Sequence, residues 1–182
     1  AYLNGVVLNQ PGASAKTGVS AWFDGLDDRV EMPALDLHGD RFSASAWVRR
    51  SGPQVDYTPI LFSRDGNTTA GLHFGQNHGL RYHWNSWKWD WKSGLAVPDD
   101  QWVFVAWVVE PDRATIYLGQ NGVLQKAENL DSHGVEEFDG TLVVGHDPIA
   151  SARHFKGWID DVRTWHGALS ESQVAAIYHA TR

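Results

Sequence analysis

Side chains that can bind a flat ligand are concentrated in residues 81–91 of this 182-residue chain. Aromatic rings stack on the apolar faces of a ligand, while amide and charged neighbours hydrogen-bond its edges. Sugars present both kinds of surface, because CH groups form their faces and hydroxyl groups their rims. The stretch therefore predicts a glycan site in which indole rings stack and polar neighbours bond, formed by Trp84, Trp87, Trp89, Trp91, Arg81, His83 and Asn85.

The same stretch also fits two neighbouring strands that bury their aromatic faces. Side chains alternate between the two faces of a strand, so residues 87–92, if extended, place their three tryptophans on one side. In the preceding strand Leu80, Tyr82 and Trp84 would share a face. A small core does not readily supply partners for four indole N–H groups, which favours exposure. Both interpretations stay open, and in both the three indoles act as one set.

Catalytic motifs are missing from the chain. It contains no Gly-x-Ser-x-Gly elbow, no phosphate-binding glycine-rich loop and no cysteine. A glycoside hydrolase remains a less favoured alternative, because its two carboxyl groups are defined by their separation in space and can come from distant residues.

Charge and composition exclude several classes of partner. The formal net charge is −7 and the fifteen basic residues are scattered, so we expect no nucleic-acid binding. No apolar run approaches membrane-spanning length, which predicts no membrane insertion. The size suits one domain, residues 1–182, and the N-terminus without Met indicates a domain excised or processed from a larger protein.

Alternating apolar and polar residues recur in short runs separated by turn residues, which is typical of an antiparallel all-β protein. Residues 102–109 are apolar on both faces and predict a central strand between two sheets. Ser170 and Gln173 fit a capping box that begins one short C-terminal helix. Residues 131–139 are expected to form a surface loop. The fold class is thus all-β, a two-sheet antiparallel sandwich with a short C-terminal helix.

Three segments carry a resemblance to a known family. They are Trp22–Met32 followed by Phe42–Val48, Pro98–Ala106, and Phe155–Trp165 followed by Ala168–Ser170. In this order they resemble the strands and helix cap of laminin-G-like or concanavalin A-like jelly rolls, which occur as accessory domains in bacterial extracellular proteins. The resemblance covers nearly the whole chain and implies a jelly-roll fold.

The resemblance also implies a structural calcium ion where the first and last strands meet. Asp24 and Asp160 occupy the matching motif positions, and backbone carbonyls near Gly25 could add oxygen ligands. Asp27, Asp28 and Asp161 could join them. Calcium needs six to eight oxygen ligands, which carboxylates, carbonyls and water supply. In the alternative, Asp24 and Gly25 form an Asx turn and an aspartate at 160 or 161 pairs with an arginine.

For function, the resemblance implies a non-catalytic carbohydrate-binding module of a larger exported bacterial protein, located outside the cell or in the periplasm. Its partners would be a polysaccharide or glycan and the other domains of the parent protein. Because one fold hosts many functions, a protein-interaction or structural module is the alternative.

Overall fold

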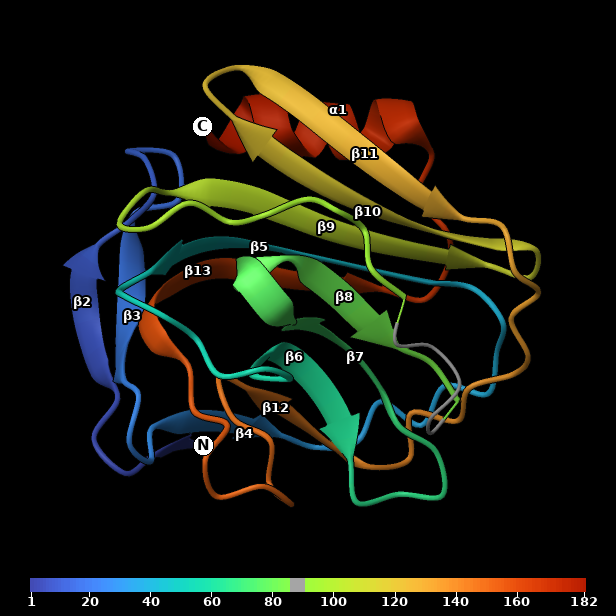
Figure 1. Ribbon diagram of the computed structural model, residues 1–182, viewed down its shortest axis with the longest axis horizontal. Coiled ribbons are helices and arrows are strands. Elements are labelled where there is room, and N and C mark those ends of the chain that lie inside the picture. The colour runs from blue at the N-terminus through green and yellow to red at the C-terminus, as the bar shows by residue number, and fades with distance from the viewer. Residues whose placement is uncertain (86–90) are drawn as a thin grey trace.

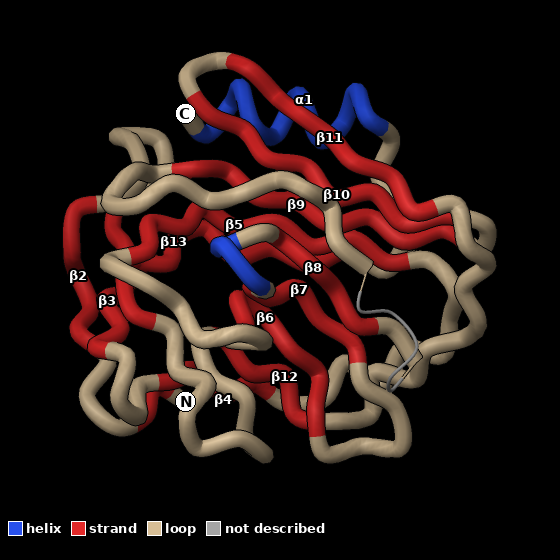
Figure 2. The backbone as a smooth tube through the Cα atoms, in the orientation of Figure 1, coloured by secondary structure: helices blue, strands red, loops and turns tan. Residues whose placement is uncertain are grey.

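Two antiparallel β-sheets packed face to face make up the computed structural model, which describes residues 1–85 and 91–182 (Figures 1 and 2). Sheet A has six strands and sheet B has seven. Strands from distant parts of the chain are neighbours, since β12 lies between β4 and β6, and β13 lies between β5 and β3. This is the predicted jelly-roll sandwich.

The strands of sheet A are short. In spatial order they are β1 (Tyr2–Leu3), β4 (Arg29–Met32), β12 (Thr141–Val144), β6 (Pro59–Arg64), β7 (Ala70–Phe74) and β8 (Leu80–His83). A short 3-10 helix, η1 (Gln76–His78), connects β7 to β8.

The strands of sheet B include the long central ones. In spatial order they are β11 (Val123–Asn129), β10 (Arg113–Gln120), β9 (Val103–Glu110), β5 (Phe42–Arg50), β13 (Lys156–Trp165), β3 (Val19–Asp24) and β2 (Val7–Pro11). Central β9 is buried on both faces, as its sequence predicts, except at Glu110. Its second face, however, meets a helix rather than a second sheet, because Phe104 contacts Tyr178.

Helix α1 (Glu171–Thr181) covers the outer face of sheet B (Figure 1). The predicted capping box is present, since Ser170 accepts from the Gln173 N–H and Gln173 accepts from the Ser170 N–H. Tyr178 packs against Trp47, whose Nε1 donates to Thr181 Oγ1 at 2.9 Å. In the described part of the chain, no helix is long and apolar enough to cross a membrane.

The segment 131–139 is a surface loop, as its polar sequence predicts, but it carries three side chains that point inward. His133, Glu136 and Phe138 are buried. The Glu136 carboxylate accepts from the Thr68 hydroxyl and from the Asn85 N–H, and burial raises its pKa. The contact with Asn85 holds the loop against the turn that follows β8.

Candidate functional site

Trp84 belongs to the core, which corrects the prediction that it stacks on a ligand. Its side chain is 0% exposed, and its ring packs edge-on against Trp107 and Phe138. The indole Nε1 donates to Gly134 O at 2.7 Å, so burial leaves no unpaired donor. Leu80 and Tyr82 point to the same side, as the alternating strand interpretation predicts.

The other three tryptophans are only partly covered by the structure. Trp87 and Trp89 lie outside the described residues, so the prediction that the three indoles form one set remains a prediction. Trp91 is partly buried and packs against the core, with its ring 6.0 Å from that of Tyr82.

The predicted polar partners of the tryptophans are divided between two places. Arg81 and His83 lie on the outer face of sheet A, opposite to Leu80 and Tyr82. Asn85 is exposed, with a left-handed φ of 52°, and its side chain donates to Val135 O at 3.0 Å. The structure therefore brings Arg81 and His83 together and gives Asn85 a turn-forming role.

A layered cluster of rings surrounds His83. His73 is fully buried, and its Nδ1 donates to Phe74 O because a carbonyl can only accept. The remaining His73 nitrogen, Nε2, therefore accepts from His83 Nδ1 at 2.9 Å. Burial, and then the neighbouring His83, hold the pKa of His73 well below its ordinary value. His73 is thus held neutral by its burial, and its tautomer is set by these two hydrogen bonds.

Tyr57 forms the outer layer of this cluster, and sequence reasoning missed it. Its ring stacks on His73 with 5.4 Å between centroids, and the Arg153 guanidinium lies 4.8 Å from the Tyr57 ring centre. Tyr57 has a φ of 68°, a left-handed conformation that is uncommon for an aromatic residue. No sequence signal marks such a position, because turn patterns point to Gly, Asn or Asp.

A pocket of about 300 Å³ adjoins this cluster through Arg81. The strand pairing places Arg81 directly opposite His73. The pocket lies between η1, β8 and the segment that follows Trp91. Its lining consists of Gln76, Asn77, Gly79, Leu80, Arg81, Lys92, Ser93, Gly94 and Ala96.

Hydrogen bonds fix both walls of this pocket. Leu80 N donates to Leu95 O at 2.8 Å, Val97 N donates to His78 O at 3.0 Å, and Ser93 Oγ donates to Leu80 O at 2.6 Å. These bonds hold residues 93–97 alongside η1 and β8.

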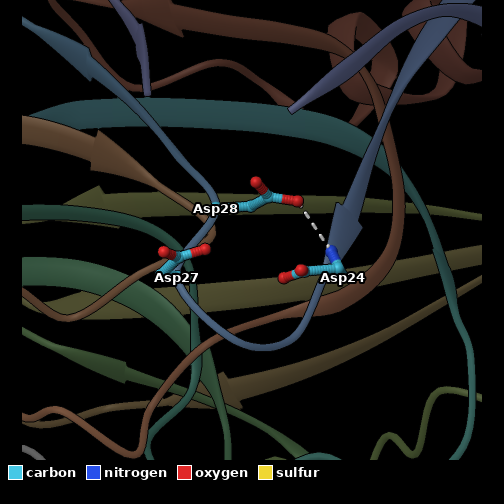
Figure 3. A group of neighbouring side chains, drawn as sticks. All are labelled: Asp24, Asp27 and Asp28. Carbon is cyan, nitrogen blue, oxygen red and sulfur yellow. Dashed lines mark hydrogen bonds between the residues drawn. The ribbon is translucent and has the colours of Figure 1, made fainter. Parts of the chain in front are cut away.

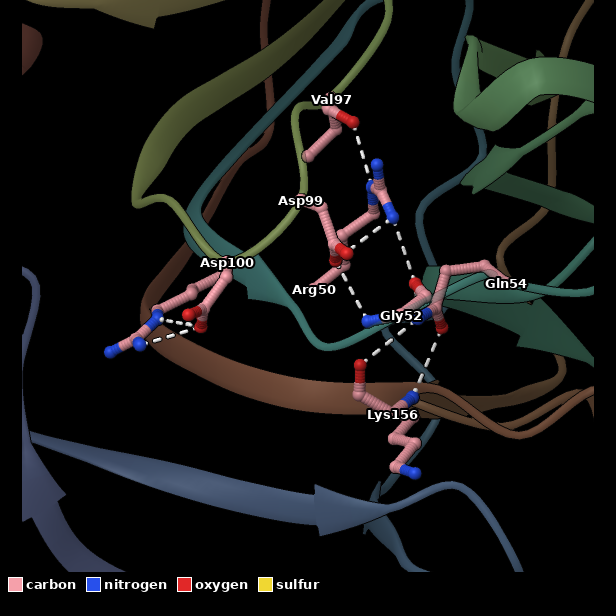
Figure 4. Close-up of polar contacts among 8 residues, drawn as sticks. Arg50, Gly52, Gln54, Val97, Asp99, Asp100 and Lys156 are labelled. Atoms are coloured by element: carbon pink, nitrogen blue, oxygen red, sulfur yellow. Dashed lines mark hydrogen bonds and ion pairs between the residues drawn. The ribbon is translucent and has the colours of Figure 1, made fainter.

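Buried Arg50 anchors the wall formed by residues 93–97 at its Val97 end (Figure 4). Arg50 Nε donates to Val97 O at 2.7 Å, and Arg50 Nη1 lies 3.0 Å from Asp99 Oδ1. The same carboxylate oxygen accepts from Gly52 N. This network ties the pocket wall to the end of β5 and so makes the pocket a fixed feature.

A larger crevice of about 440 Å³ opens beside β3 and β13. Core residues such as Phe23, Val144 and Ile159 line it, together with Asp160 and Asp161 at one side. It is mostly apolar and offers few converging hydrogen-bonding groups, so it is the weaker candidate for a polar ligand.

Three aspartates form a candidate metal centre in the turn between β3 and β4 (Figure 3). One carboxylate oxygen from each of Asp24, Asp27 and Asp28 lies within 4.8 Å of the other two. Asp28 is buried, which raises its pKa, and its Oδ2 accepts from Asp24 N at 2.9 Å. Its Oδ1 is buried and has no hydrogen-bond partner among the described residues.

Asp160 is not part of this centre, which corrects the predicted metal set. Lys156 is the residue paired with Asp24, so Asp160 lies four residues further along β13, roughly 13 Å away at about 3.3 Å per residue. Its carboxylate instead accepts from Ala13 N at 2.9 Å. Gly25 is in the turn with a φ of 82°, and Asp24 Oδ1 accepts from Leu26 N in an Asx turn.

The aspartate–arginine pair that the alternative to a calcium site predicts is also present, because Arg163 Nε donates to Asp161 Oδ1 at 2.8 Å. The Asx turn and a metal site at the three aspartates are compatible, since Asp24 has a second carboxylate oxygen.

Solved structures with the same architecture come from several kinds of protein. Domain 4 of AbnA, a GH43 extracellular arabinanase from Geobacillus stearothermophilus in complex with arabinotriose, has a TM-score of 0.72 at 24% identity, over 99% of this chain and 82% of that one. A heptameric SAP-like pentraxin from Limulus polyphemus has a TM-score of 0.59 at 17% identity, over 86% and 80%. Trypanosoma rangeli sialidase has a TM-score of 0.63 at 14% identity, over 88% of this chain but 27% of the sialidase.

These identities are low, so the structural similarity establishes the fold alone. The chain matches no curated protein in sequence. A sequence profile of the Laminin_G_3 family does match, over residues 23–175. Since this span is most of the chain, the protein belongs to the concanavalin A-like lectin/glucanases superfamily.

Proposed function

We propose that this domain is a non-catalytic carbohydrate-binding module of a larger exported bacterial protein. The observation that carries the proposal is the fixed pocket of about 300 Å³ beside β8. Amide, hydroxyl and guanidinium groups of Gln76, Asn77, Ser93 and Arg81 line it, and such groups pair with sugar hydroxyls. Its volume suits one or two sugar units.

The composition of the pocket supports binding without catalysis. Glycosidases place two carboxyl groups on either side of the bond they break. Among residues 1–85 and 91–182, those that line this pocket include neither aspartate nor glutamate. Glu136, whose pKa is raised as that of a general acid would be, is fully buried and bonded to Thr68 and Asn85.

The family and its relatives support the same proposal. The arabinanase domain with the same fold was solved with arabinotriose, and it is a domain of an extracellular enzyme. By analogy, this module would hold a parent protein close to a polysaccharide, with a modest affinity that other domains of the parent protein strengthen through avidity. Trp87, Trp89 and Trp91 are the proposed stacking residues.

A glycan array followed by calorimetric titration of the best ligand tests the proposal. Replacing exposed Gln76 with alanine removes one pocket amide, and we expect binding to weaken by about threefold to tenfold. Gln125→Ala changes an exposed amide on β11 and serves as the matched control. If the array shows no glycan binding, the proposal fails and a protein-interaction module becomes the better explanation.

We further propose that the three aspartates of the β3–β4 turn hold a structural calcium ion. The fit rests on two observations: one carboxylate oxygen from each of the three aspartates lies within 4.8 Å of the others, and Asp28 Oδ1 is buried without a hydrogen-bond partner among the described residues. Calcium supplies the counter-charge that such a cluster needs, and backbone oxygens and water complete its shell.

Thermal melting with calcium and with chelator tests this site. A calcium concentration 100 times the Kd adds about 2.7 kcal/mol to the free energy of unfolding if only the folded state binds. Asp28→Asn should abolish the calcium-dependent rise in Tm, while Asp160→Asn should retain it. An equal rise in both variants would show that the ion binds elsewhere.

A further inference from the structure

A separate pocket of about 330 Å³ lies on the outer face of sheet B, beside the start of α1 (Figure 1). Its described lining comes from β9, β10 and β11 and from residues 168–173 at the helix start. Val108, Ala168 and Leu169 supply its apolar surface, and its other described side chains are polar or charged. This α1 pocket belongs to sheet B, whereas the pocket beside β8 belongs to sheet A.

Two buried hydroxyl groups of β10 line the α1 pocket. Thr115 and Tyr117 are 4% and 5% exposed, while their neighbours Ala114 and Ile116 point into the core between the sheets. Neither hydroxyl has a hydrogen-bond partner among residues 1–85 and 91–182. A hydroxyl can donate one hydrogen bond and accept two, so both groups are available to a ligand that enters the pocket.

One end of the α1 pocket carries an acid whose charge is offset. Glu110 Oε2 lies 3.5 Å from Arg113 Nε, and Glu110 Oε1 lies 3.9 Å from Arg41 Nη1. Two guanidinium groups therefore neutralise this carboxylate.

At the other end, one ammonium group serves two carboxylates. Lys126 Nζ lies 2.8 Å from Glu171 Oε2 and 3.7 Å from Glu128 Oε1, so one negative charge is left over. Burial is the main cause that raises the pKa of Tyr117. The three glutamates of the pocket raise it further, and Lys126 lowers it. The charges around the Tyr117 hydroxyl thus favour a positively charged ligand.

From this arrangement we propose that the α1 pocket is a second ligand site, which binds a saccharide that carries a protonated amine. The ammonium group pairs with Glu128 and Glu171 through charge-assisted hydrogen bonds. Sugar hydroxyls bond to Thr115 and Tyr117, and the CH face of the ring contacts Leu169. A basic side chain of a partner protein would bring the charge without the hydroxyls, so the two buried hydroxyl groups favour the saccharide. The inference concerns a different site from the proposed function and goes beyond it.

An NMR titration with two matched ligands tests the inference. The trimer of glucosamine and the trimer of N-acetylglucosamine share one backbone, but only the first carries ammonium groups in mildly acidic buffer. We expect the glucosamine trimer to bind about twofold to fivefold more tightly at low salt, and this preference to shrink at high ionic strength. The amide signals of residues 168–173 and of β10 should shift on binding.

Variants locate the site. Tyr117→Phe removes a hydroxyl that no described residue uses, so Tm should be unchanged while both trimers bind about twofold to tenfold more weakly. Glu128→Gln should reduce the preference for the glucosamine trimer. Glu137→Gln is the matched control, because the Glu137 and Glu128 side chains are both 38% exposed, and it should leave the preference unchanged.

Four other outcomes overturn the inference. Equal affinities of the two trimers would show that the pocket does not select a charged amine. If the peptide tri-lysine binds as tightly as the glucosamine trimer, charge alone selects the ligand and the saccharide assignment is wrong. If Glu137→Gln lowers the preference as much as Glu128→Gln does, the attraction is not located at this pocket. A lower Tm of Tyr117→Phe with unchanged affinity would make that hydroxyl a structural group. The glycan array and Gln76→Ala report on the pocket beside β8, so either site can fail without the other.

Discussion

The outer faces of the two sheets differ in what covers them. On sheet B, helix α1 places Tyr178 against Trp47 and Phe104, so apolar contact closes the face. On sheet A, the corresponding face carries His73, Arg81 and His83, next to Tyr57 and Arg153. Burial of polar groups costs free energy unless each finds a partner, so such a face contributes less to stability than an apolar one. The comparison assigns stability to the face of sheet B that α1 covers, and the ligand recognition proposed for the pocket beside β8 belongs to the side of sheet A.

The largest expected effect is on sheet B. Trp47→Ala removes a buried ring and its bond to Thr181, and should lower the free energy of unfolding by about 3–5 kcal/mol. Urea denaturation measures this loss. Glycan affinity of the folded fraction should stay unchanged, and a loss of affinity without a loss of stability would break the comparison.

Acid should destabilise the protein through sheet A. The folded-state pKa of His73 is well below its ordinary value, so below about pH 6.5 the unfolded chain binds a proton that the folded chain does not. Stability therefore falls as pH drops below this point, by up to about 1.4 kcal/mol per pH unit for His73.

Denaturation curves at several pH values, compared with His73→Gln, measure that slope. The pKa of Glu136 is raised and acts with the opposite sign, since its contribution is lost as pH rises. The parent protein and the His73→Gln variant both keep Glu136, so the difference between their pH slopes isolates the contribution of His73. Equal slopes would show that His73 is protonated in the folded state.

A smaller effect is expected at the start of α1. Ser170→Ala removes the cap and should cost about 1 kcal/mol, whereas Ser170→Asp retains an acceptor and should cost less. Thermal melts compare the two. If alanine is as stable as aspartate, packing of Tyr178 alone holds the helix on sheet B.

The smallest change in stability is expected at Tyr57. Tyr57→Gly removes the ring that supports Arg153 but also relieves a left-handed conformation, which costs a non-glycine residue about 1–2 kcal/mol. These effects nearly offset each other, so we expect stability within about 1 kcal/mol of the parent, and weaker binding of the glycan. Titration and urea denaturation of one preparation measure both. Strong destabilisation with unchanged binding would place Tyr57 among the structural residues.

Local patterns were predictable from sequence. Ser170 and Gln173 are three residues apart, and their capping box forms without reference to the rest of the chain. The alternation in residues 80–84 likewise indicated that Leu80, Tyr82 and Trp84 share a face, but not which face is buried. That choice depends on Gly134 and Phe138, which are about fifty residues away in sequence.

Long-range register explains the remaining errors. Asp160 matches a motif position but lies four residues beyond the partner of Asp24, a displacement that only the β3–β13 pairing reveals. Glu136 looks like an exposed loop residue because its partners, Thr68 and Asn85, come from other parts of the chain. Tyr57 could be recognised only from the structure, because its left-handed backbone and its contact with His73 leave no sequence pattern.

The described lining of the pocket beside β8 comes from two stretches that are close in sequence, residues 76–81 and 92–96. The first stretch starts after Phe74, in the core, and the second ends before Val97, which Arg50 holds in place. Exchange of the lining side chains between related domains, with the core residues Leu80, Tyr82 and Trp84 kept, should transfer the proposed ligand preference without disturbing sheet A. Evolution, or a protein engineer, can therefore diversify the recognition of this module by cassette replacement.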